Sequence, residues 1–257
     1  MLYALGFISM FLIGGFSGIM HAAAAADTQQ HDSYFVVAHF HYVMIGGALF
    51  ALLAGMTYWF PKITGRMMSE ARGRRIFWLF FGGFNLTFFP MHFLGLDGMP
   101  RRIYTYSAEM GWQFWNLAAT IGAFVLAASL LLYIIELCRA LRSGAPVGND
   151  PWDARTLEWS TTSPPPVYNF ERLPAVSSLD AFWEAKQGAD TLSDMPEHEA
   201  GMHLPQPSYF PALCTLGILL GAYGLLYSGI LAMVGLLLAV FSIYGWAFEG
   251  VGQEELV

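Results

Sequence analysis

Six long apolar segments constrain the fold of this 257-residue sequence more than any other feature. Each approaches the ~20 residues that a helix needs to cross a bilayer. Backbone groups in lipid must pair within their own segment, and barrel-type alternation is absent, so helices are expected. We predict an all-α, polytopic membrane helix bundle with about six transmembrane helices. The segments lie at roughly 1–21, 36–60, 76–96, 112–137, 206–226 and 228–247.

The composition supports a membrane protein and excludes several other classes. Hydrophobic residues make up 56% of the chain and charged residues only 12%, against about 25% charged in a typical soluble domain. The net charge is −7, and no basic face of the kind that binds nucleic acid is visible, so no nucleic-acid partner is expected. The two cysteines form no CxxC pair, which argues against a thiolate metal site and against a disulfide framework.

Basic residues predict the orientation in the membrane. The loop after the second segment is expected to be cytoplasmic by the positive-inside rule. Arg139 and Arg142, after the fourth segment, agree with this orientation. Arg101 and Arg102 fall on the outside, which suggests a specific anionic partner, although two solvated surface arginines remain an alternative. The basic residues of the cytoplasmic loop are Lys62, Arg66, Arg72, Arg74 and Arg75.

Three regions are predicted along the chain. Residues 1–142 hold four transmembrane helices, the first of which reads as a membrane helix whose preceding partners lie outside this chain. Residues 143–205 form a Pro-rich, polar, cytoplasmic linker that is extended around its prolines. Residues 206–257 form a two-helix transmembrane hairpin, in which small residues permit close helix contact. These small residues are Gly217, Gly221, Gly224 and Gly235.

His39 and His41 are the strongest candidates for functional residues. Ionisable or ligand-type side chains are costly at membrane depth, so they point to function by default. Two positions along a helix correspond to a rotation of roughly 200°, which sends the two side chains in opposite directions. A regular helix therefore prevents them from sharing one metal, but each can reach a different planar cofactor. Hydrogen bonding within the bundle is the alternative explanation.

Three stretches of the sequence carry a resemblance to a known family. The run from His31 to Tyr42, HDSYFVVAHFHY, resembles the signature around the tenth helix of subunit I of haem–copper terminal oxidases. Residues 85–95, NLTFFPMHFLG, followed by 98–102, GMPRR, are similar to the eleventh helix of that subunit and the loop after it. Residues 156–166 resemble its C-terminal tail. The resemblance covers about residues 1–170.

The resemblance implies haem-binding roles at five positions. His39 matches the proximal ligand of the high-spin, oxygen-binding haem, and is therefore the catalytic candidate. His41 matches one of the two axial ligands of the low-spin haem. Asp27 matches an acid near a haem propionate. Arg101 and Arg102 would pair with propionates, which explains a basic pair on the outer side, because arginine forms charge-assisted bonds with carboxylates.

The resemblance also implies a magnesium site and shows some departures from the family. His31 and Asp32 match magnesium ligands at the boundary of subunits I and II, and their nitrogen and oxygen atoms suit a divalent cation. Without the resemblance, His31 and Asp32 are explained equally well as polar residues at the start of a membrane helix. Ser33 stands where threonine is common, Met91 where glutamine is usual, and Asp97 where a small neutral residue is usual.

The family's remaining cofactor ligands have no counterpart in this sequence. The copper ligands, the crosslinked tyrosine and the second axial histidine of the low-spin haem lie on earlier helices in the family. The chain therefore resembles the C-terminal third of subunit I and is not expected to reduce oxygen alone. A naturally split subunit and a truncated reading frame both remain open.

The resemblance implies a part of cytochrome c oxidase, a proton-pumping respiratory enzyme of the bacterial inner membrane. Electrons would pass from cytochrome c through the low-spin haem to a haem–copper centre that reduces oxygen to water. The expected cofactors are two haems of the a type, copper on the missing part of the subunit, and magnesium. The expected partners are the remainder of subunit I, subunits II and III, cytochrome c and membrane lipid. The alternatives are a structural remnant that binds no haem, a quinol-fed oxidase, and another haem membrane protein.

Overall fold

The protein is described by a computed structural model over residues 1–166, 169–170, 174–190, 192–194 and 208–249. These residues form two units, Met1–Asp194 and Met195–Val257, and each unit is described by itself. Part of the predicted linker 143–205, including His198 and His203, lies outside the described residues.

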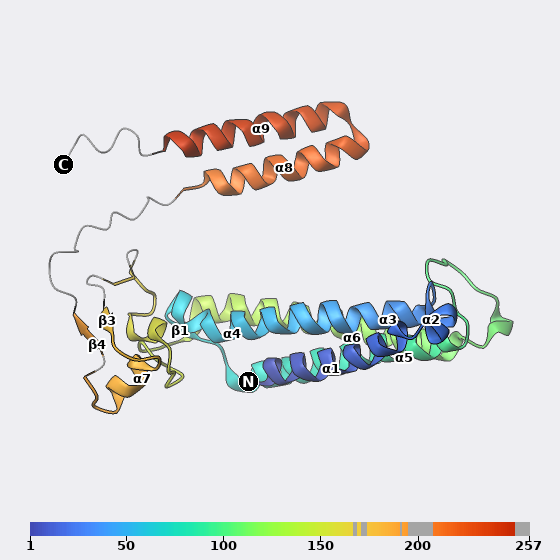
Figure 1. Cartoon of the computed structure of the whole chain (residues 1–257), viewed down its shortest axis with the longest axis horizontal. Helices are drawn as coiled ribbons and strands as arrows, with labels where there is room; N and C mark the ends of the chain where they lie inside the picture. Colours follow the sequence, from blue (N-terminus) through green and yellow to red (C-terminus); the bar gives the residue numbers. More distant parts are fainter. Residues whose placement is uncertain (167–168, 171–173, 191, 195–207, 250–257) are drawn as a thin grey trace. The chain divides into compact units, whose positions relative to one another are not determined.

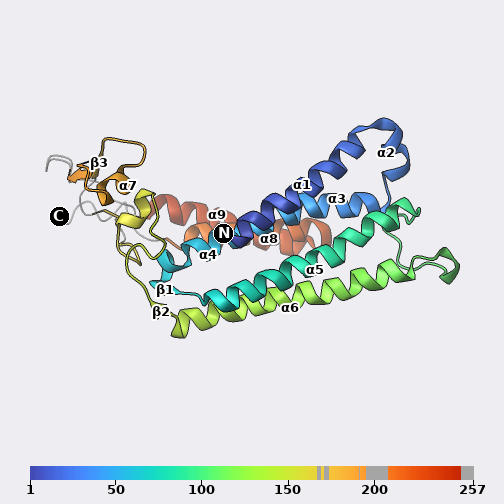
Figure 2. The same cartoon turned by 90° about the horizontal axis from the view of Figure 1, so that it is seen from below.

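The first unit is built on long helices that run along a common direction (Figures 1 and 2). Its membrane-length part contains α1 (Leu2–Ala22), α2 (Ala24–Gln30), α3 (Tyr34–Met44), a π-helical turn (Ile45–Leu49), α4 (Phe50–Thr64), α5 (Glu70–Leu96) and α6 (Gln113–Ser143). Strands β1 (Arg66–Met67) and β2 (Ala145–Pro146) pair antiparallel, as do β3 (Pro174–Val176) and β4 (Leu192–Asp194). Single 3-10 turns lie at Ala108–Met110 and Leu157–Ser160, and α7 covers Ala181–Lys186.

The second unit contains the two C-terminal helices, α8 (Phe210–Tyr227) and α9 (Gly229–Phe248). Ser228 between them has an extended backbone, so the helices turn back on each other as the predicted hairpin. A Cβ atom on Gly224 would collide with the backbone of Ala232, and one on Gly235 would collide with the backbone of Gly221. The small residues therefore allow the two helices to approach closely.

Six helical segments among the described residues are long and apolar enough to cross a membrane, which confirms the predicted fold class. Their bounds differ from the sequence-based ranges mainly at the start of the third span and at the end of the fourth. The third span begins at Glu70 instead of residue 76, and the fourth ends at Ser143 instead of residue 137. Charged turns continue these helices beyond the apolar zone, and hydropathy does not detect such turns.

The second span, Tyr34–Thr64, is one helix interrupted by the π-helical turn. It begins at Ser33, whose hydroxyl oxygen accepts a hydrogen bond from the Phe35 amide at 3.2 Å, as an N-cap should. It ends at Gly65, which adopts a left-handed conformation with φ of 67°. The π-helical turn changes the helical register between the half that carries His39 and His41 and the inner half.

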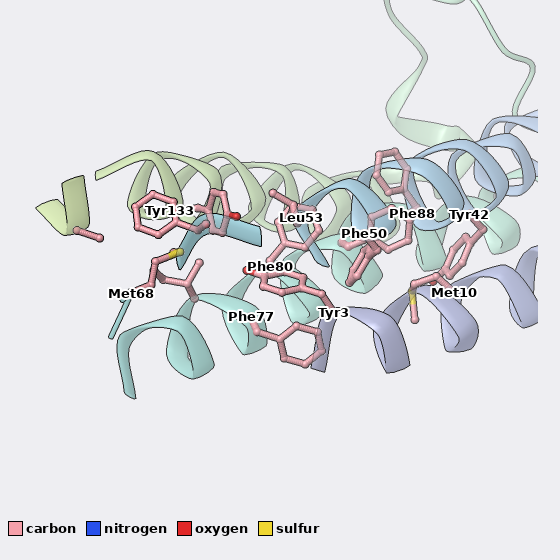
Figure 3. Close-up of a cluster of buried hydrophobic side chains, with 14 residues drawn as sticks. Tyr3, Met10, Tyr42, Phe50, Leu53, Met68, Phe77, Phe80, Phe88 and Tyr133 are labelled. Atoms are coloured by element: carbon pink, nitrogen blue, oxygen red, sulfur yellow. The ribbon is translucent and has the colours of Figure 1, made fainter. Parts of the chain in front are cut away.

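Aromatic side chains from five helices, α1, α3, α4, α5 and α6, form the packed centre of the first unit (Figure 3). Tyr3 of α1 packs edge-to-face against Phe77 at 5.2 Å, and Phe50 of α4 packs against Phe80 at 4.8 Å. Tyr133 of α6 lies 6.1 Å from Tyr3. Lipid tails are as apolar as these rings, so close packing and edge-to-face ring contacts hold this centre together, not exclusion from water.

Helices α5 and α6 approach closely at two glycines. A Cβ atom on Gly83 would lie 2.8 Å from the Leu126 amide nitrogen, and one on Gly122 would collide with the backbone of Thr87. The Thr87 hydroxyl donates to the Gly83 carbonyl at 2.7 Å and so is satisfied within its own helix. The pair α5–α6 is therefore a closely packed element of the unit (Figure 2).

An ion pair with a buried carboxylate joins the N-terminal part of α5 to the C-terminal part of α6. Glu136 is 2% exposed, and its carboxylate accepts hydrogen bonds from Arg72 Nε at 2.5 Å and from Arg72 Nη2 at 3.1 Å. The Ser69 amide donates to the same carboxylate at 3.0 Å. These three bonds compensate a charge that burial would otherwise make costly.

Replacing Arg72 with Gln is expected to destabilise the protein, because it leaves the Glu136 carboxylate buried without a charged partner. The loss is moderated by water, since the Arg72 side chain is 41% exposed. The free energy of unfolding in detergent measures the effect. Arg74→Gln is the matched control, and equal unfolding energies for the two variants would contradict the role of the ion pair.

The segment after α6 packs on the inner end of α4 and is not simply extended. Trp159 is fully buried, and its indole NH donates to the Tyr58 hydroxyl at 2.9 Å. The Lys62 ammonium donates to the Thr161 carbonyl at 2.8 Å and to the Thr162 carbonyl at 3.1 Å. The prediction of an extended linker missed this arrangement, because it depends on contacts between residues about 100 positions apart.

Lys186 of α7 fixes a second part of this segment. Its ammonium lies 2.8 Å from Asp150 and 2.7 Å from Asp153, and it also donates to the Ala154 carbonyl at 2.7 Å. Desolvation opposes the charge, but the hydrogen bonds to the two carboxylates outweigh it and raise the pKa of Lys186. Lys186 therefore remains charged at neutral pH and holds residues 150–154 against α7.

Candidate functional site

His39 lies on the side of α3 that faces α1. Its Nδ1 lies 2.9 Å from the Ser17 hydroxyl and 3.1 Å from the Gly14 carbonyl oxygen. The Ser17 hydroxyl itself donates to the Gly14 carbonyl at 3.0 Å, so it can accept from His39. These acceptors assign the proton to Nδ1, which leaves the lone pair on Nε2 free to bind a metal.

His41 lies on the side of α3 that faces α5. Its Nδ1 lies 2.7 Å from the Val37 carbonyl oxygen, one turn earlier in the helix. Its ring stacks on Phe88 of α5, with centroids 4.1 Å apart and planes at 14°. The carbonyl again assigns the proton to Nδ1, and the stacked phenyl ring fixes the plane of the imidazole.

The two histidines therefore present unprotonated Nε2 atoms on opposite sides of one helix. This arrangement agrees with the direction that the His-x-His spacing predicted. An Nδ1–H donated to a backbone carbonyl is the usual arrangement of a metal-binding histidine, because it sets both the tautomer and the ring orientation. The donor set thus fits two separate haem irons, one for His39 and one for His41.

His21 approaches the His39 side of the site, which the sequence-based interpretation did not expect. The His21 ring centroid lies 5.0 Å from that of His39 and 5.2 Å from that of Phe35. Its Nδ1 lies 3.4 Å from the Asp27 carboxylate, which is an ion-pair distance but lacks hydrogen-bond geometry. Asp27 is thereby brought toward the His39 side of α3.

The loop that carries Arg101 is joined to the start of α3 by backbone bonds. The Tyr34 amide donates to the Met99 carbonyl at 2.9 Å, and the Arg101 amide donates to the Asp32 carbonyl at 2.8 Å. Ser33 and Pro100 form an isolated antiparallel bridge between these bonds. The GMPRR loop is therefore fixed relative to the helix that carries both histidines.

The arginine pair has the character of an anion site. The Arg101 guanidinium forms an ion pair with Asp32, but its buried Nε has no hydrogen-bond partner within the described residues. Arg102 is exposed and takes a left-handed backbone with φ of 68°. Such a conformation is uncommon for arginine, and Arg102 lies close to Met99 and Arg101, whose backbone groups bond to residues 32–34. An unpaired buried donor and a free guanidinium suit a carboxylate ligand.

His31 and Asp32 show a less complete metal site. His31 Nδ1 lies 2.6 Å from the Asp27 carbonyl oxygen, and its side chain is exposed. One carboxylate oxygen of Asp32 is engaged by Arg101. No group of three or more His, Cys, Asp or Glu side chains able to hold a metal ion occurs in the described part of the chain. A cation bound by His31 and Asp32 would therefore need further ligands from outside these residues.

Sequence reasoning missed the side chains that support the two histidines. Ser17, His21 and Phe88 lie on other helices, and nothing in their local sequence marks them as neighbours of His39 or His41. Ser17 alone carried a usable signal, since a small polar residue in an apolar helix commonly bonds to a neighbouring helix.

Comparison with known proteins gives a consistent family match. The family model described as cytochrome c and quinol oxidase polypeptide I matches residues 1–125. Cytochrome c oxidase subunit 1 of Bacillus sp. strain PS3 is 49% identical, over 94% of this chain and 40% of its own length. Quinol oxidase subunit 1 of Bacillus subtilis strain 168 is 43% identical, over 93% of this chain and 38% of its own length. The chain thus spans about 40% of the length of these curated relatives.

A solved structure supports the fold. A haem–copper terminal oxidase dimer matches with a TM-score of 0.51 and 22% identity, over 56% of this chain and 27% of that chain. The sequence matches also extend farther than the sequence motifs indicated. Because they cover 93–94% of the chain, the similarity continues past residue 170 into the region of α8 and α9.

Proposed function

We propose that this chain is part of a haem–copper oxidase subunit I and supplies one axial ligand to each of two haems in a terminal respiratory oxidase. The observation that carries this proposal is the placement of His39 and His41. Each Nδ1 is held by a carbonyl, and the two free Nε2 atoms face opposite sides of α3. Two haems can therefore be bound on either side of a single helix, each completed by residues outside this chain.

In this proposal the chain's own residues bind and orient the cofactors. His39 binds the high-spin haem and is oriented by Ser17 and Gly14, while His41 binds the low-spin haem and is oriented by Phe88. When bound, the haems supply electron transfer and oxygen activation, together with copper on the remainder of subunit I. The remaining helices of subunit I and subunits II and III complete the enzyme, which would reduce oxygen and pump protons across the bacterial plasma membrane.

Arg101, Arg102 and Asp27 are proposed to act at the haem propionates. The loop bonds hold the two arginines beside the outer end of α3, where the unpaired Arg101 Nε can donate to a carboxylate. Magnesium at His31 and Asp32 is part of the same proposal, with its further ligands supplied by subunit II.

For the electron donor we propose cytochrome c, which the MPRR form of the propionate loop favours. Two relatives from one organism support this choice. In Bacillus subtilis strain 168, cytochrome c oxidase subunit 1 is 50% identical to this chain and quinol oxidase subunit 1 is 43% identical. The quinol-fed alternative retains the same two haem ligands and differs only in how electrons enter.

Co-expression with the remainder of the oxidase tests the proposal. We expect the purified complex to contain this chain and two haems, visible in the reduced-minus-oxidised spectrum, with only one haem responding to carbon monoxide. A pyridine haemochrome spectrum identifies the haem type, and turnover with reduced cytochrome c or a quinol identifies the donor. Absence of both a haem signal and a co-purifying partner would favour the structural remnant instead.

A further inference from the structure

The basic residues at the inner end of the first unit fall into two groups. Arg72 is neutralised by Glu136, while Lys62 and Arg66 donate to backbone carbonyls of later segments. Four arginines of α5 and α6 are exposed and form no ion pair within the described residues. These four are Arg74, Arg75, Arg139 and Arg142.

Two of the four arginines flank an exposed tryptophan. Arg74 and Arg75 lie about 100° apart around α5, and Trp78 projects between them one turn deeper in the span. The Trp78 side chain is 57% exposed, and its ring is held edge-to-face by Phe77 at 5.1 Å and by Phe81 at 5.9 Å. We call Arg74, Arg75 and Trp78 the Arg–Trp patch.

We propose that the Arg–Trp patch binds the headgroup of an anionic phospholipid in the cytoplasmic leaflet. The two guanidinium groups would hold the phosphate, with the bidentate geometry that arginine offers to phosphate oxygens. The indole lies one turn nearer the bilayer centre, at the level where tryptophan meets headgroups and the first acyl carbons. One lipid molecule thereby satisfies both the charged and the apolar part of the patch.

The depth of the patch in the membrane is the reason to choose a lipid as the occupant. The patch lies within the span Glu70–Leu96, at the end that the basic residues place in the cytoplasm. Exposed apolar side chains continue below Trp78 along α5, including Leu86 and Phe89, and can accommodate acyl chains. Complementary charge together with an apolar continuation fits a phospholipid.

Arg139 and Arg142 provide a matched comparison on the neighbouring helix. They also lie at the inner end of a span, and they carry the same total charge as Arg74 and Arg75. One turn deeper on α6 lie aliphatic side chains such as Ile135, where α5 has an indole. Nonspecific attraction to an anionic surface would act equally on the two arginine pairs. A specific lipid site requires two arginines beside a tryptophan, and of these two helices α5 has that combination.

The test uses the full chain in phosphatidylcholine vesicles that contain phosphatidylglycerol with brominated acyl chains, which quench nearby tryptophan. Subtracting the emission of a Trp78→Phe variant isolates the signal of Trp78. We expect brominated phosphatidylglycerol to quench Trp78 more strongly than the same fraction of brominated phosphatidylcholine. Removing one arginine should reduce this preference about fivefold, which corresponds to about 1 kcal/mol per basic residue near an anionic surface.

The double variant Arg74→Gln/Arg75→Gln should lose the preference, while Arg139→Gln/Arg142→Gln should keep it. On the unmodified chain, raising the salt concentration should weaken the preference, which gives a measurement independent of any variant's folding. Equal quenching of Trp78 by the two lipids in the unmodified chain would overturn the proposal. So would an equal loss of preference in both double variants, because that result indicates a diffuse surface charge.

Discussion

Replacing His41 with alanine in the assembled oxidase is expected to abolish the low-spin haem signal and leave the high-spin haem detectable. The two rings face opposite sides of α3 and share no hydrogen-bond partner, so loss of one leaves the other oriented by Ser17 and Gly14. The reduced-minus-oxidised spectrum reports the low-spin haem, and the carbon monoxide difference spectrum reports the high-spin haem. Electron transfer to the oxygen-reducing centre should stop completely, because the chain of cofactors is interrupted.

The reciprocal variant His39→Ala should remove the carbon monoxide response and leave the low-spin signal. His92→Ala is the matched control, because His92 lies in a neighbouring motif of α5 and, among the described residues, its Nδ1 bonds to the Phe89 carbonyl of its own helix at 3.2 Å. Both haem signals should survive in that control. Persistence of both haems in His41→Ala would show that the assignment of His41 is wrong.

The second large effect is expected at Gly95, near the outer end of α5. A Cβ atom there would collide with the backbone nitrogen and Cα of Phe35, in the first turn of α3. Backbone atoms at this point cannot shift cheaply, because the Tyr34 amide is bonded to Met99. We expect Gly95→Ala to cost about 3 kcal/mol, the upper end of the usual range for overpacking, and to reduce both haem signals together.

Gly73→Ala is the matched control for Gly95→Ala. It lies in the same helix, and a Cβ atom there meets no other atom within 4 Å. It should therefore leave the haem content unchanged and stabilise the helix slightly, because alanine has the higher helix propensity. Thermal unfolding in detergent and the haem-to-protein ratio measure both variants. Similar values for the two variants would exclude a specific contact between Gly95 and α3.

Local sequence was sufficient to predict the features that depend on helical periodicity. Hydropathy alone located the six spans, and two-residue spacing alone predicted that His39 and His41 point in opposite directions. The close approach of α8 and α9 likewise depends on glycines that are visible in the sequence. Each of these features is determined within a few turns of one chain segment.

Features that depend on distant contacts were not predictable in this way. The bonds of Lys62 to Thr161 and Thr162 join residues about 100 positions apart. The sequence therefore predicted an extended linker, whereas this segment packs on α4. The approach of His21 to His39 depends on how α1 packs against α3. The assignment of haems and magnesium to the histidines came from the family resemblance, since geometry alone shows only free nitrogen atoms.

The π-helical turn Ile45–Leu49 has a consequence for how this helix can vary in length. A π turn holds one more residue than the α-helical turn it replaces. In evolutionary terms it behaves as a single-residue insertion that the helix absorbs without breaking. The inserted residue rotates the outer half by roughly 100° relative to the inner half. The direction in which the two histidine side chains point can therefore evolve separately from the direction of Phe50 and Leu53, although all four residues belong to one continuous span.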